Sequence, residues 1–177
     1  MMPTLYEIKG PWPGRLAITA RPRGWDWLED EISAWRRAGV NEVASLLTEP
    51  EAAELGLADE GAFCRVGGLD FRNLPIEDRG VPDSDEVALE LIWALENDLQ
   101  QGRSVAVHCR QGIGRSGMMA ALLLTAGGMG LESALERVSR ARGIEVPETA
   151  AQYDWAKRMA DRLNAVPATT NERIPAL

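Results

Sequence analysis

A short apolar run that leads into a glycine-rich turn places the strongest limit on how this chain can fold. Ser104–His108 reads Ser-Val-Ala-Val-His, which is typical of a central strand in a parallel sheet. The next residues, Cys109–Gly117, hold three glycines, and Arg115–Ala126 has the composition of a buried helix. A strand, a sharp turn and a helix in this order predict an α/β fold.

The rest of the chain continues this alternation. Apolar spacing predicts strands at Arg15–Thr19 and Glu42–Leu47, and strand-like pieces within Phe63–Leu74. It predicts helices at Trp25–Ala38, Pro50–Leu55, Asp83–Gln101, Leu131–Ala141 and Pro147–Asn164. We therefore expect an α/β fold in which a central, mostly parallel sheet is flanked by helices.

Several local signals refine the predicted helices. Gly39 and Gly102 stand where two of the helices should end. Asp83, with Glu86 three residues later, predicts a capping box at the start of the long helix. We interpret the tryptophans of the helical segments as packing residues, namely Trp25, Trp27, Trp35 and Trp93.

Length and composition predict one soluble domain. The chain has 177 residues, of which 45% are hydrophobic and 26% are charged. We expect a single domain over 1–165 and a flexible tail over 166–177, which is rich in Pro, Thr and Ala. No apolar stretch approaches about 20 residues, and the N-terminus lacks the pattern of a secretory signal. Two cysteines cannot build a disulfide framework, so we expect a cytoplasmic location.

The charge balance limits the partners. A formal net charge of −8 argues against general binding to nucleic acid or to an anionic membrane. A phosphate site in this chain must therefore create a local positive field. His108 is the only histidine, which argues against a Ser-His-Asp triad and against a metal site with two histidines. We expect neither a metal ion nor a cofactor, and no oligomeric state follows from the sequence.

The segment Cys109–Arg115, called the anion-binding loop below, has the features of a phosphate site. The turn from strand to helix directs backbone N–H groups at one point, and the helix N-terminus adds about half a positive charge. Arg115 supplies a planar fork for two phosphate oxygens. Cys109 lies at the base, where positive surroundings lower the pKa of a thiol. The predicted phosphate-binding residues are Arg110, Gln111, Gly112, Ile113, Gly114 and Arg115.

Other interpretations of this loop fit less well. Gly112–Gly117 also satisfies the dinucleotide pattern G-x-G-x-x-G, but that fold needs a second strand with an acidic end about 20 residues on, where this chain has a helical pattern. The Walker loop is excluded because no Lys-Ser/Thr pair follows the glycines. A buried structural cysteine does not account for Arg115 six positions after Cys109.

His108-Cys109-x5-Arg115-Ser116 resembles the signature loop of the protein tyrosine phosphatase superfamily, in its compact dual-specificity branch. Leu74–Asp78, followed by Val81-Pro82-Asp83, resembles the acid loop of the cyclin-dependent-kinase-associated phosphatase group. The resemblance extends from about Gly14 to Leu163. Low-molecular-weight tyrosine phosphatases and arsenate reductases instead place the loop near the N-terminus. Rhodanese-like phosphatases lack a matching upstream Pro-x-x-Asp.

The resemblance assigns a general acid, and Asp78 is our choice. A single carboxyl can protonate the leaving oxygen and later activate water, typically contributing about 10²–10⁴-fold. Glu77 is the nearest competitor because it is adjacent and has the same chemistry. Asp83 has the capping role given above, and Asp70 is interpreted as a turn residue.

The same resemblance implies roles for other residues. Ser116 donates a hydrogen bond to the sulfur that leaves the phosphocysteine, and it also fits as a first-turn helix hydroxyl. His108 supports the cysteine through hydrogen bonding and is not the general base. Gln152 resembles a glutamine that positions water, although a surface glutamine is the simpler interpretation. Arg110 adds positive charge at the mouth of the site or is a solvated surface residue.

Three further residues have open interpretations. Cys64 fits a resolving cysteine for reversible oxidation of Cys109. A buried structural thiol fits better, because relatives with an upstream resolving cysteine place it on the preceding strand. Arg21 and Arg23 lie before the first predicted helix, where they either contact substrate or are ordinary exposed loop residues.

The predicted function is a cysteine-dependent phosphatase that acts through a phosphocysteine. Its partner is a phosphorylated protein, and its shallow site admits phosphotyrosine and, as a further option, phosphoserine and phosphothreonine. Phosphoinositide phosphatases of the superfamily tend to have lysines in the loop, and this loop has none. The alternatives are a phosphatase of a small molecule or of an RNA 5′-phosphate, and a non-catalytic phosphate-binding module.

Overall fold

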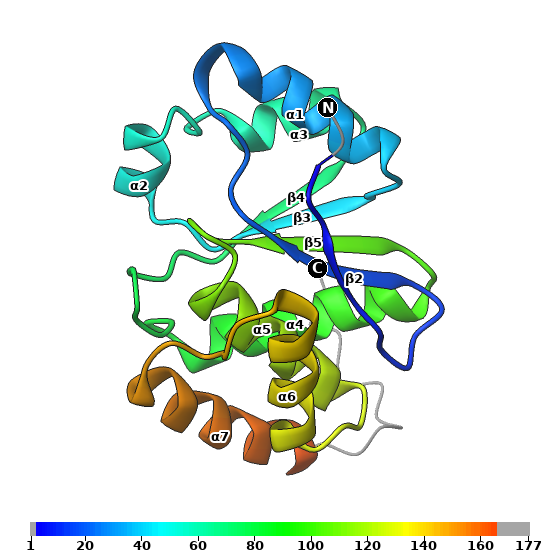
Figure 1. The fold of residues 1–177 in the computed structure, drawn as a ribbon, viewed down its shortest axis with the longest axis vertical. Helices are drawn as coiled ribbons and strands as arrows, with labels where there is room; N and C mark the ends of the chain where they lie inside the picture. The colour runs from blue at the N-terminus through cyan, green and yellow to red at the C-terminus, as the bar shows by residue number, and fades with distance from the viewer. Residues whose placement is uncertain (1–2, 166–177) are drawn as a thin grey trace.

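A five-stranded sheet forms the centre of the molecule (Figure 1). The computed structural model describes residues 3–165. The strands lie in the order β1-β2-β5-β3-β4, and only β1 runs antiparallel to its neighbour. Their bounds are β1 Tyr6–Ile8, β2 Arg15–Thr19, β3 Glu42–Ser45, β4 Asp70–Asn73 and β5 Ser104–His108. The predicted central, mostly parallel sheet is confirmed.

The carboxyl ends of the four parallel strands meet at one edge of the sheet. His108, the last residue of β5, pairs with Thr19 of β2 on one side and with Ser45 of β3 on the other. Ser45 pairs in turn with Asn73 of β4. The loops that follow these strands therefore lie together, at the edge where ligands bind in open α/β sheets.

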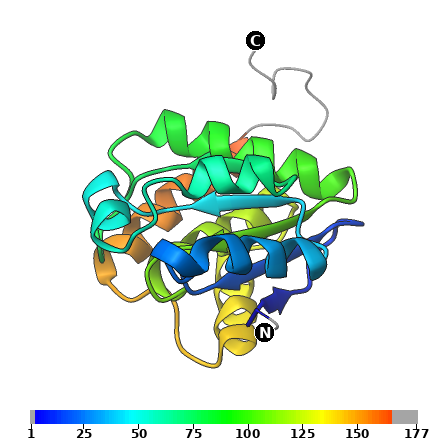
Figure 2. The same ribbon diagram turned by 90° about the horizontal axis from the view of Figure 1, so that it is seen from above.

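Helices cover both faces of the sheet (Figures 1 and 2). One layer holds α1 Leu28–Arg37, α2 Glu49–Glu54 and α3 Glu60–Val66. The other holds α4 Asp85–Gln100, α5 Gly114–Ala126, α6 Leu131–Arg142 and α7 Ala150–Ala165. Every residue of α5 except its last is buried, because α4, α6, α7 and the sheet all pack around this helix.

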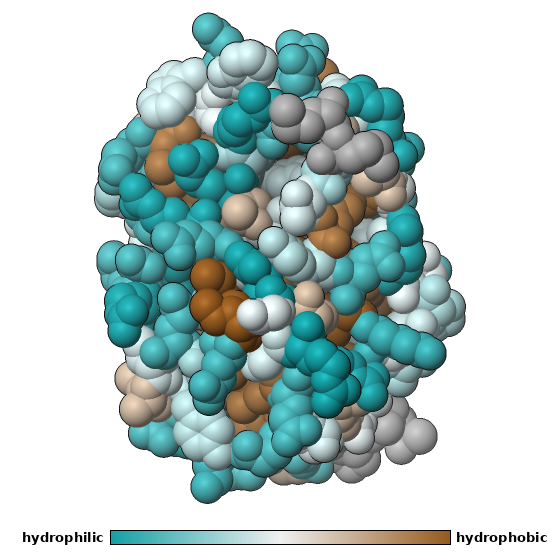
Figure 3. All heavy atoms as spheres, viewed as in Figure 1, coloured by the Kyte–Doolittle hydropathy of each residue, from teal (hydrophilic) through white to brown (hydrophobic). Residues whose placement is uncertain are grey.

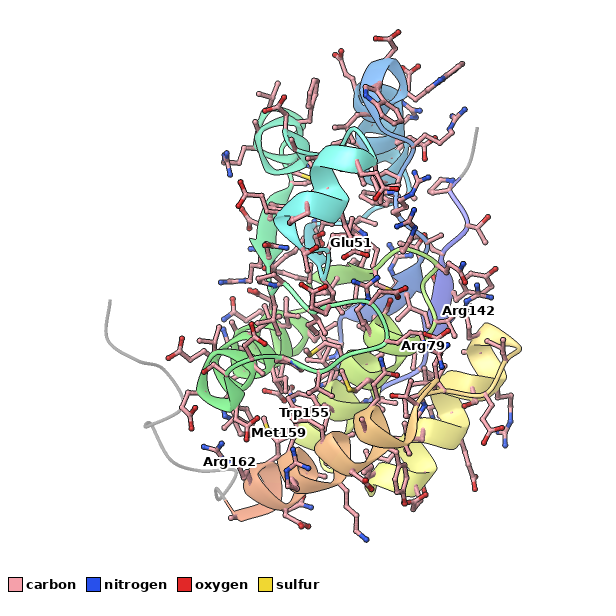
Figure 4. The ribbon with its side chains drawn as sticks, turned by 90° about the vertical axis from the view of Figure 1, so that its left-hand side faces the viewer. Glu51, Arg79, Arg142, Trp155, Met159 and Arg162 are labelled. Atoms are coloured by element: carbon pink, nitrogen blue, oxygen red, sulfur yellow. The ribbon has the colours of Figure 1, made fainter. Side chains whose placement is uncertain are left out.

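The two faces of the sheet have separate apolar cores. Trp35 of α1 anchors the core on the α1–α3 side, and Trp155 of α7 belongs to the larger core on the other side. Figure 4 shows Trp155 and Met159 on α7, both of them buried in that larger core. The indole N–H of Trp155 donates to the Asp85 carboxylate at 2.7 Å, which fixes α7 against the start of α4. The loop that precedes α4 is thereby anchored at its end.

Two elements differ from the sequence-based predictions. The strand β1 was not predicted, since it is short and only its last residue is buried. Glu60–Val66 forms a helix, whereas strand-like pieces are predicted from Phe63 onward. Only Cys64 and Glu60 of this helix are buried. A single-turn burial pattern of this kind does not distinguish helix from strand in the sequence.

The predictions for four individual residues are wrong. Ser84, not Asp83, is the N-cap of α4, and its hydroxyl accepts from the Val87 N–H at 3.3 Å. Asp70 is the first residue of β4 and pairs with Arg103, so it is not a turn residue. Trp25 and Trp27 are exposed rather than packed in a core. The Arg23 guanidinium covers the Trp27 ring at 4.4 Å.

The surface is mostly hydrophilic on the face that Figure 3 shows, where the apolar spots are small and separate. Within 3–165, no helix is long and apolar enough to cross a membrane. The predicted tail over 166–177 lies outside the described residues.

Candidate active site

The anion-binding loop connects β5 to α5, as the sequence predicts. Gly112 has a φ of +67°, and a Cβ at this position would lie 2.3 Å from the Thr19 carbonyl oxygen. At Gly117 an added Cβ would lie 2.8 Å from Val146, and at Gly114 it would meet the carboxylate end of the Glu148 side chain at 2.1 Å. Gly112 is therefore required by the turn, Gly117 allows close packing against Val146, and a side chain at Gly114 would displace Glu148.

Cys109 is buried at the base of this loop. Its sulfur accepts a hydrogen bond from the Ser116 hydroxyl at 2.9 Å. Burial alone would raise the pKa of the Cys109 thiol, but the Ser116 hydroxyl, backbone N–H groups of the loop and the charge of Arg115 together lower it. The surroundings of Cys109 thus favour the thiolate form of its side chain.

Arg115 is held beside Cys109 by a carboxylate that the sequence analysis did not single out. Both Nη atoms of Arg115 donate to Glu51 of α2, at 2.7 and 3.0 Å, and Nη1 also donates to the Ile76 carbonyl at 2.7 Å. Burial alone would raise the pKa of Glu51, but hydrogen bonds from Arg115 and Thr48 lower it. A bidentate pair of this kind, with Arg115 buried and Glu51 partly buried, fixes the plane of the guanidinium.

Glu51 has a second contact that explains its local conformation. Its carboxylate accepts from the Thr48 N–H at 3.1 Å, while the Thr48 hydroxyl accepts from the Glu51 N–H, so the two residues form a capping box at the start of α2. The Thr48-x-x-Glu51 spacing is visible in the sequence, but it indicates a helix start and not a partner for Arg115.

Asp78 lies at the mouth of the site, in the loop between β4 and α4. Its Oδ1 is 3.3 Å from Arg115 Nη2, and the side chain is 63% exposed. Glu77, the competing acid, is exposed and is not among the residues that line the pocket around Cys109. The structure therefore brings Asp78, and not Glu77, to the anion-binding loop.

Gln152 connects the loop that carries Asp78 to the start of α7. It is fully buried, its Nε2 donates to the Gly80 carbonyl at 3.1 Å, and its Oε1 accepts from the Glu148 N–H at 3.0 Å. The interpretation as a surface glutamine is wrong. Because both ends of the amide are bonded to backbone, Gln152 positions the loop, and water positioning stays a prediction.

Arg142 supports the anion-binding loop from outside, and Arg110 is part of the loop itself. Arg142, at the end of α6, donates to the carbonyls of Gly112 at 2.8 Å and of Gln111 at 3.2 Å, and it stacks on Tyr6. Glu51 and Arg142 thus approach the anion-binding loop from opposite helix layers (Figure 4). Arg110 lies at the mouth, where it pairs with Glu54 at 3.2 Å.

The remaining candidates lie outside the pocket. His108 is fully buried behind Cys109, with Nε2 2.8 Å from the Glu60 carboxylate. Cys64 is a buried thiol on α3, and burial together with the charge of Glu60 raises its pKa to about 12. The structural interpretation of Cys64 is the one that its surroundings favour.

Arg21 and Arg23 also lie outside the pocket. Arg23 pairs with Glu31 at 2.6 Å, and Arg21 donates to the Pro22 carbonyl.

The pocket around Cys109 has a volume of about 170 Å³. It is lined by Asp78, Arg79, Cys109, Arg110, Gln111, Ile113, Gly114, Arg115 and Glu148. Arg79 and Glu148 were not predicted to take part. Arg79 has a φ of +60°, a conformation that is strained for a residue other than glycine. Among the residues of 3–165, no group of three carboxylate, histidine or cysteine side chains is arranged to hold a metal ion.

A larger groove of about 880 Å³ lies beside this pocket, between α6 and α7, and shares Arg79 and Glu148 with it. Its charged lining residues comprise four carboxylates and two guanidinium groups. They are Glu132, Glu136, Glu145, Glu148, Arg79 and Arg140.

A mostly parallel sheet with a buried Cys-x5-Arg loop at its carboxyl edge defines a member of the protein tyrosine phosphatase superfamily. Among known families, the chain matches the one described as PTP-SAK, Swiss Army Knife protein, DSP-PTPase phosphatase domain, over residues 11–170. The chain belongs to this DSP-PTPase family, and the predicted resemblance is confirmed.

Curated relatives agree with the assignment. Cyclin-dependent kinase inhibitor 3 of Sus scrofa is 26% identical over 140 residues, which cover 78% of this chain and 66% of that protein. The protein of the same name from Homo sapiens is also 26% identical, with the same coverage. The chain therefore spans slightly less than two thirds of the length of these relatives.

Solved structures share the fold. Kinase associated phosphatase (KAP), with serine at its catalytic cysteine, gives a TM-score of 0.84 at 20% identity and covers 94% of this chain and 99% of that chain. Tk-PTP in its active form gives 0.76 at 28% identity, with coverages of 92% and 99%. PTPMT1 in complex with PI(5)P gives 0.70 at 20% identity, with coverages of 85% and 92%.

Proposed function

We propose that this chain hydrolyses phosphate monoesters through a phosphocysteine formed on Cys109. The observation that carries the proposal is the contact of the Cys109 sulfur with Ser116, inside a loop that also holds Arg115. A free thiol has a pKa of about 8.5. The lowered pKa of Cys109 therefore increases the share of the nucleophilic thiolate at neutral pH, and Arg115 with the loop N–H groups binds the phosphate oxygens.

The first chemical step transfers the phosphoryl group to sulfur. A phosphate oxygen takes the place of Asp78 on Arg115 Nη2, which releases the carboxyl to face the leaving group. The sulfur of Cys109 attacks phosphorus, the P–O ester bond breaks, and the carboxyl of Asp78 donates its proton to the departing oxygen.

The second step returns the enzyme to its starting state. Water attacks the phosphocysteine, the carboxylate of Asp78 takes the proton of that water, and the S–P bond breaks. The Ser116 hydroxyl donates to the sulfur as it regains its negative charge, at the position the structure gives for this contact. His108 is buried behind the loop, with Nε2 on Glu60 and Nδ1 toward the Cys109 carbonyl, so it takes no part in proton transfer.

For the substrate we propose a phosphoprotein with cationic residues near the phosphorylated side chain. The groove that adjoins the pocket has more carboxylates than guanidinium groups, and the chain as a whole has a net charge of −8. This field repels RNA and anionic lipid surfaces and attracts lysine and arginine side chains. The lipid PI(5)P belongs to PTPMT1, whose likeness to this chain is one of fold.

Two assays test the proposal in turn. The purified chain should hydrolyse p-nitrophenyl phosphate in the presence of EDTA, and Cys109→Ser should abolish this activity. Activity that persists in Cys109→Ser would contradict the mechanism. Matched phosphotyrosine, phosphoserine and phosphothreonine peptides, with either Arg or Glu at the flanking positions, are then compared with soluble short-chain PI(5)P and a 5′-phosphorylated RNA. Faster turnover of the Arg peptides supports a protein substrate, and preference for the lipid or the RNA overturns it.

A further inference from the structure

Glu60 and His108 form a buried contact directly behind the anion-binding loop. His108 Nε2 lies 2.8 Å from Glu60 Oε1, and the two side chains are 0% and 3% exposed. Glu60 is the first residue of α3, and His108 is the last residue of β5, immediately before Cys109. The contact therefore connects a helix that carries no other residue of the site to the strand that positions the nucleophile.

The contacts of the imidazole determine how many protons it holds. Nε2 faces a carboxylate oxygen, and Nδ1 faces the Cys109 carbonyl oxygen at 3.3 Å. A neutral imidazole has one N–H, and its other nitrogen is an acceptor that would face an oxygen lone pair. An imidazolium donates at both nitrogens and satisfies both contacts. The neutral alternative requires the proton to reside on the Glu60 carboxyl.

Charge around the ring favours the imidazolium. Burial alone would lower the pKa of His108, but the charge of Glu60, its hydrogen bond, the Cys109 carbonyl and the charge of Cys109 together raise it. Neighbours of the pair include Trp35 of α1, the β-sheet neighbours Thr19 and Ser45, and Cys64 of α3. The pKa of Cys64 is raised to about 12 by burial and by the charge of Glu60, while the cation of Arg65 opposes the shift.

We propose that Glu60 is a positioning residue that keeps His108 doubly protonated, so that a fixed positive charge and an N–H donor hold the first residue of the anion-binding loop. This inference rests on the proposed role of Cys109 as the nucleophile. The ring of His108 lies between the Cys109 carbonyl oxygen and the Glu60 carboxylate. The charge of Cys109 raises the pKa of His108, so the imidazolium in turn stabilises the thiolate and adds to the field of Arg115.

Glu60→Gln removes the charge of Glu60 and retains the hydrogen bond to His108. The glutamine amide donates to Nε2 of a neutral imidazole, while Nδ1–H still donates to the Cys109 carbonyl, so both hydrogen bonds persist without the charges. Glu42→Gln is the matched control. Glu42 is another buried carboxyl, but it lies at the opposite end of β3 from Ser45, the residue that pairs with His108.

The proton count is measured first, by ¹⁵N NMR of the imidazole. His108 is the only histidine, so its ring signals need no assignment. We expect two protonated nitrogens at pH 7 in the wild type and in Glu42→Gln, and one in Glu60→Gln. One protonated nitrogen in the wild type overturns the proposal. This measurement on the wild type does not depend on whether any variant folds.

The effect on the nucleophile is measured by iodoacetamide alkylation of Cys109 between pH 4.5 and 9, followed by mass spectrometry of its peptide. We expect the apparent pKa of Cys109 to rise by about one unit in Glu60→Gln, which lowers the alkylation rate roughly tenfold on the acid side. The rate profile of Glu42→Gln should match the wild type. An unchanged profile in Glu60→Gln contradicts the inference. Neither the NMR spectrum nor the alkylation rate depends on phosphatase activity. A failure of the proposed function in the phosphatase assay can therefore be distinguished from a failure of this inference.

Discussion

The Ser116 hydroxyl lies 2.9 Å from the Cys109 sulfur, and both side chains are buried at the junction of β5 and α5. The hydroxyl comes from the first turn of α5, so the helix that supplies positive potential to the loop also supplies the donor to the sulfur. A donor in this position stabilises negative charge on sulfur in the free protein and, in the proposed reaction, when the S–P bond breaks.

Removing the Ser116 hydroxyl should slow the second chemical step more than the first. Hydrogen bonds to charged groups contribute about 1.5–3 kcal/mol, so Ser116→Ala should slow phosphocysteine hydrolysis roughly 10- to 100-fold. Rapid-mixing experiments with p-nitrophenyl phosphate should then show a burst of p-nitrophenol followed by a slow steady state. Thr125→Ala removes another buried hydroxyl from α5 and is the control. If the burst rate and the steady-state rate fall by the same factor, Ser116 does not act on the sulfur as a leaving group.

Replacing the acid should produce a loss that depends on the leaving group. Asp78→Asn should lower kcat about 10²- to 10⁴-fold with an alkyl phosphate, whose oxygen needs a proton, and much less with a highly acidic phenol. Glu77→Gln is the control, since Glu77 is outside the pocket that Asp78 lines. Plots of log kcat against leaving-group pKa test this. If Glu77→Gln gives the steeper slope, the acid has been assigned to the wrong carboxyl.

The core of the candidate site could be predicted because it lies in one continuous segment. Cys109, Arg115 and Ser116 are close in sequence, and the apolar run before them and the glycines among them have local physical reasons to form a strand and a turn. Asp78 lies far away in sequence, and its prediction depended on the resemblance. A cytoplasmic location stays a prediction.

The supporting residues could not be predicted because each acts across a long-range contact. Glu51 and Glu60 are carboxylates on short helices with no local signal for Arg115 or His108 as partners. Arg142 reaches the Gln111 and Gly112 carbonyls from the end of α6. Such contacts depend on how the helix layers are placed on the sheet, whereas periodicity reports only on burial within one element.

The bidentate contact between Glu51 and Arg115 predicts that phosphate affinity depends on Glu51. Glu51→Gln retains an acceptor for the Thr48 N–H but loses the charge that fixes the guanidinium, so phosphate should bind roughly tenfold or more weakly. The inhibition constant of inorganic phosphate measures this directly. Glu49→Gln, an exposed carboxyl on the same helix, should leave the constant unchanged. Equal constants for Glu51→Gln and the wild type would exclude this role.

A buried carboxyl away from the site should make stability depend on pH. Burial and the neighbouring Asp98 raise the pKa of Glu42 from its ordinary value of 4.5 to about 7, although Arg72 opposes the shift. Between these two values the folded chain retains a proton that the unfolded chain has lost. The contribution of Glu42 to the free energy of unfolding is therefore largest below pH 4.5 and falls as the pH rises through about 7.

Glu42→Gln removes this titration, because the amide does not ionise. The stability of the variant relative to the wild type should therefore improve as the pH is raised from 5 to 8, by an amount on the order of 3 kcal/mol at most. Urea denaturation of both proteins at the two pH values measures the difference, and the other titrating groups cancel in the comparison. A difference that stays constant with pH would mean that Glu42 is ionised in the folded chain throughout this range, with its charge fully compensated by Arg72.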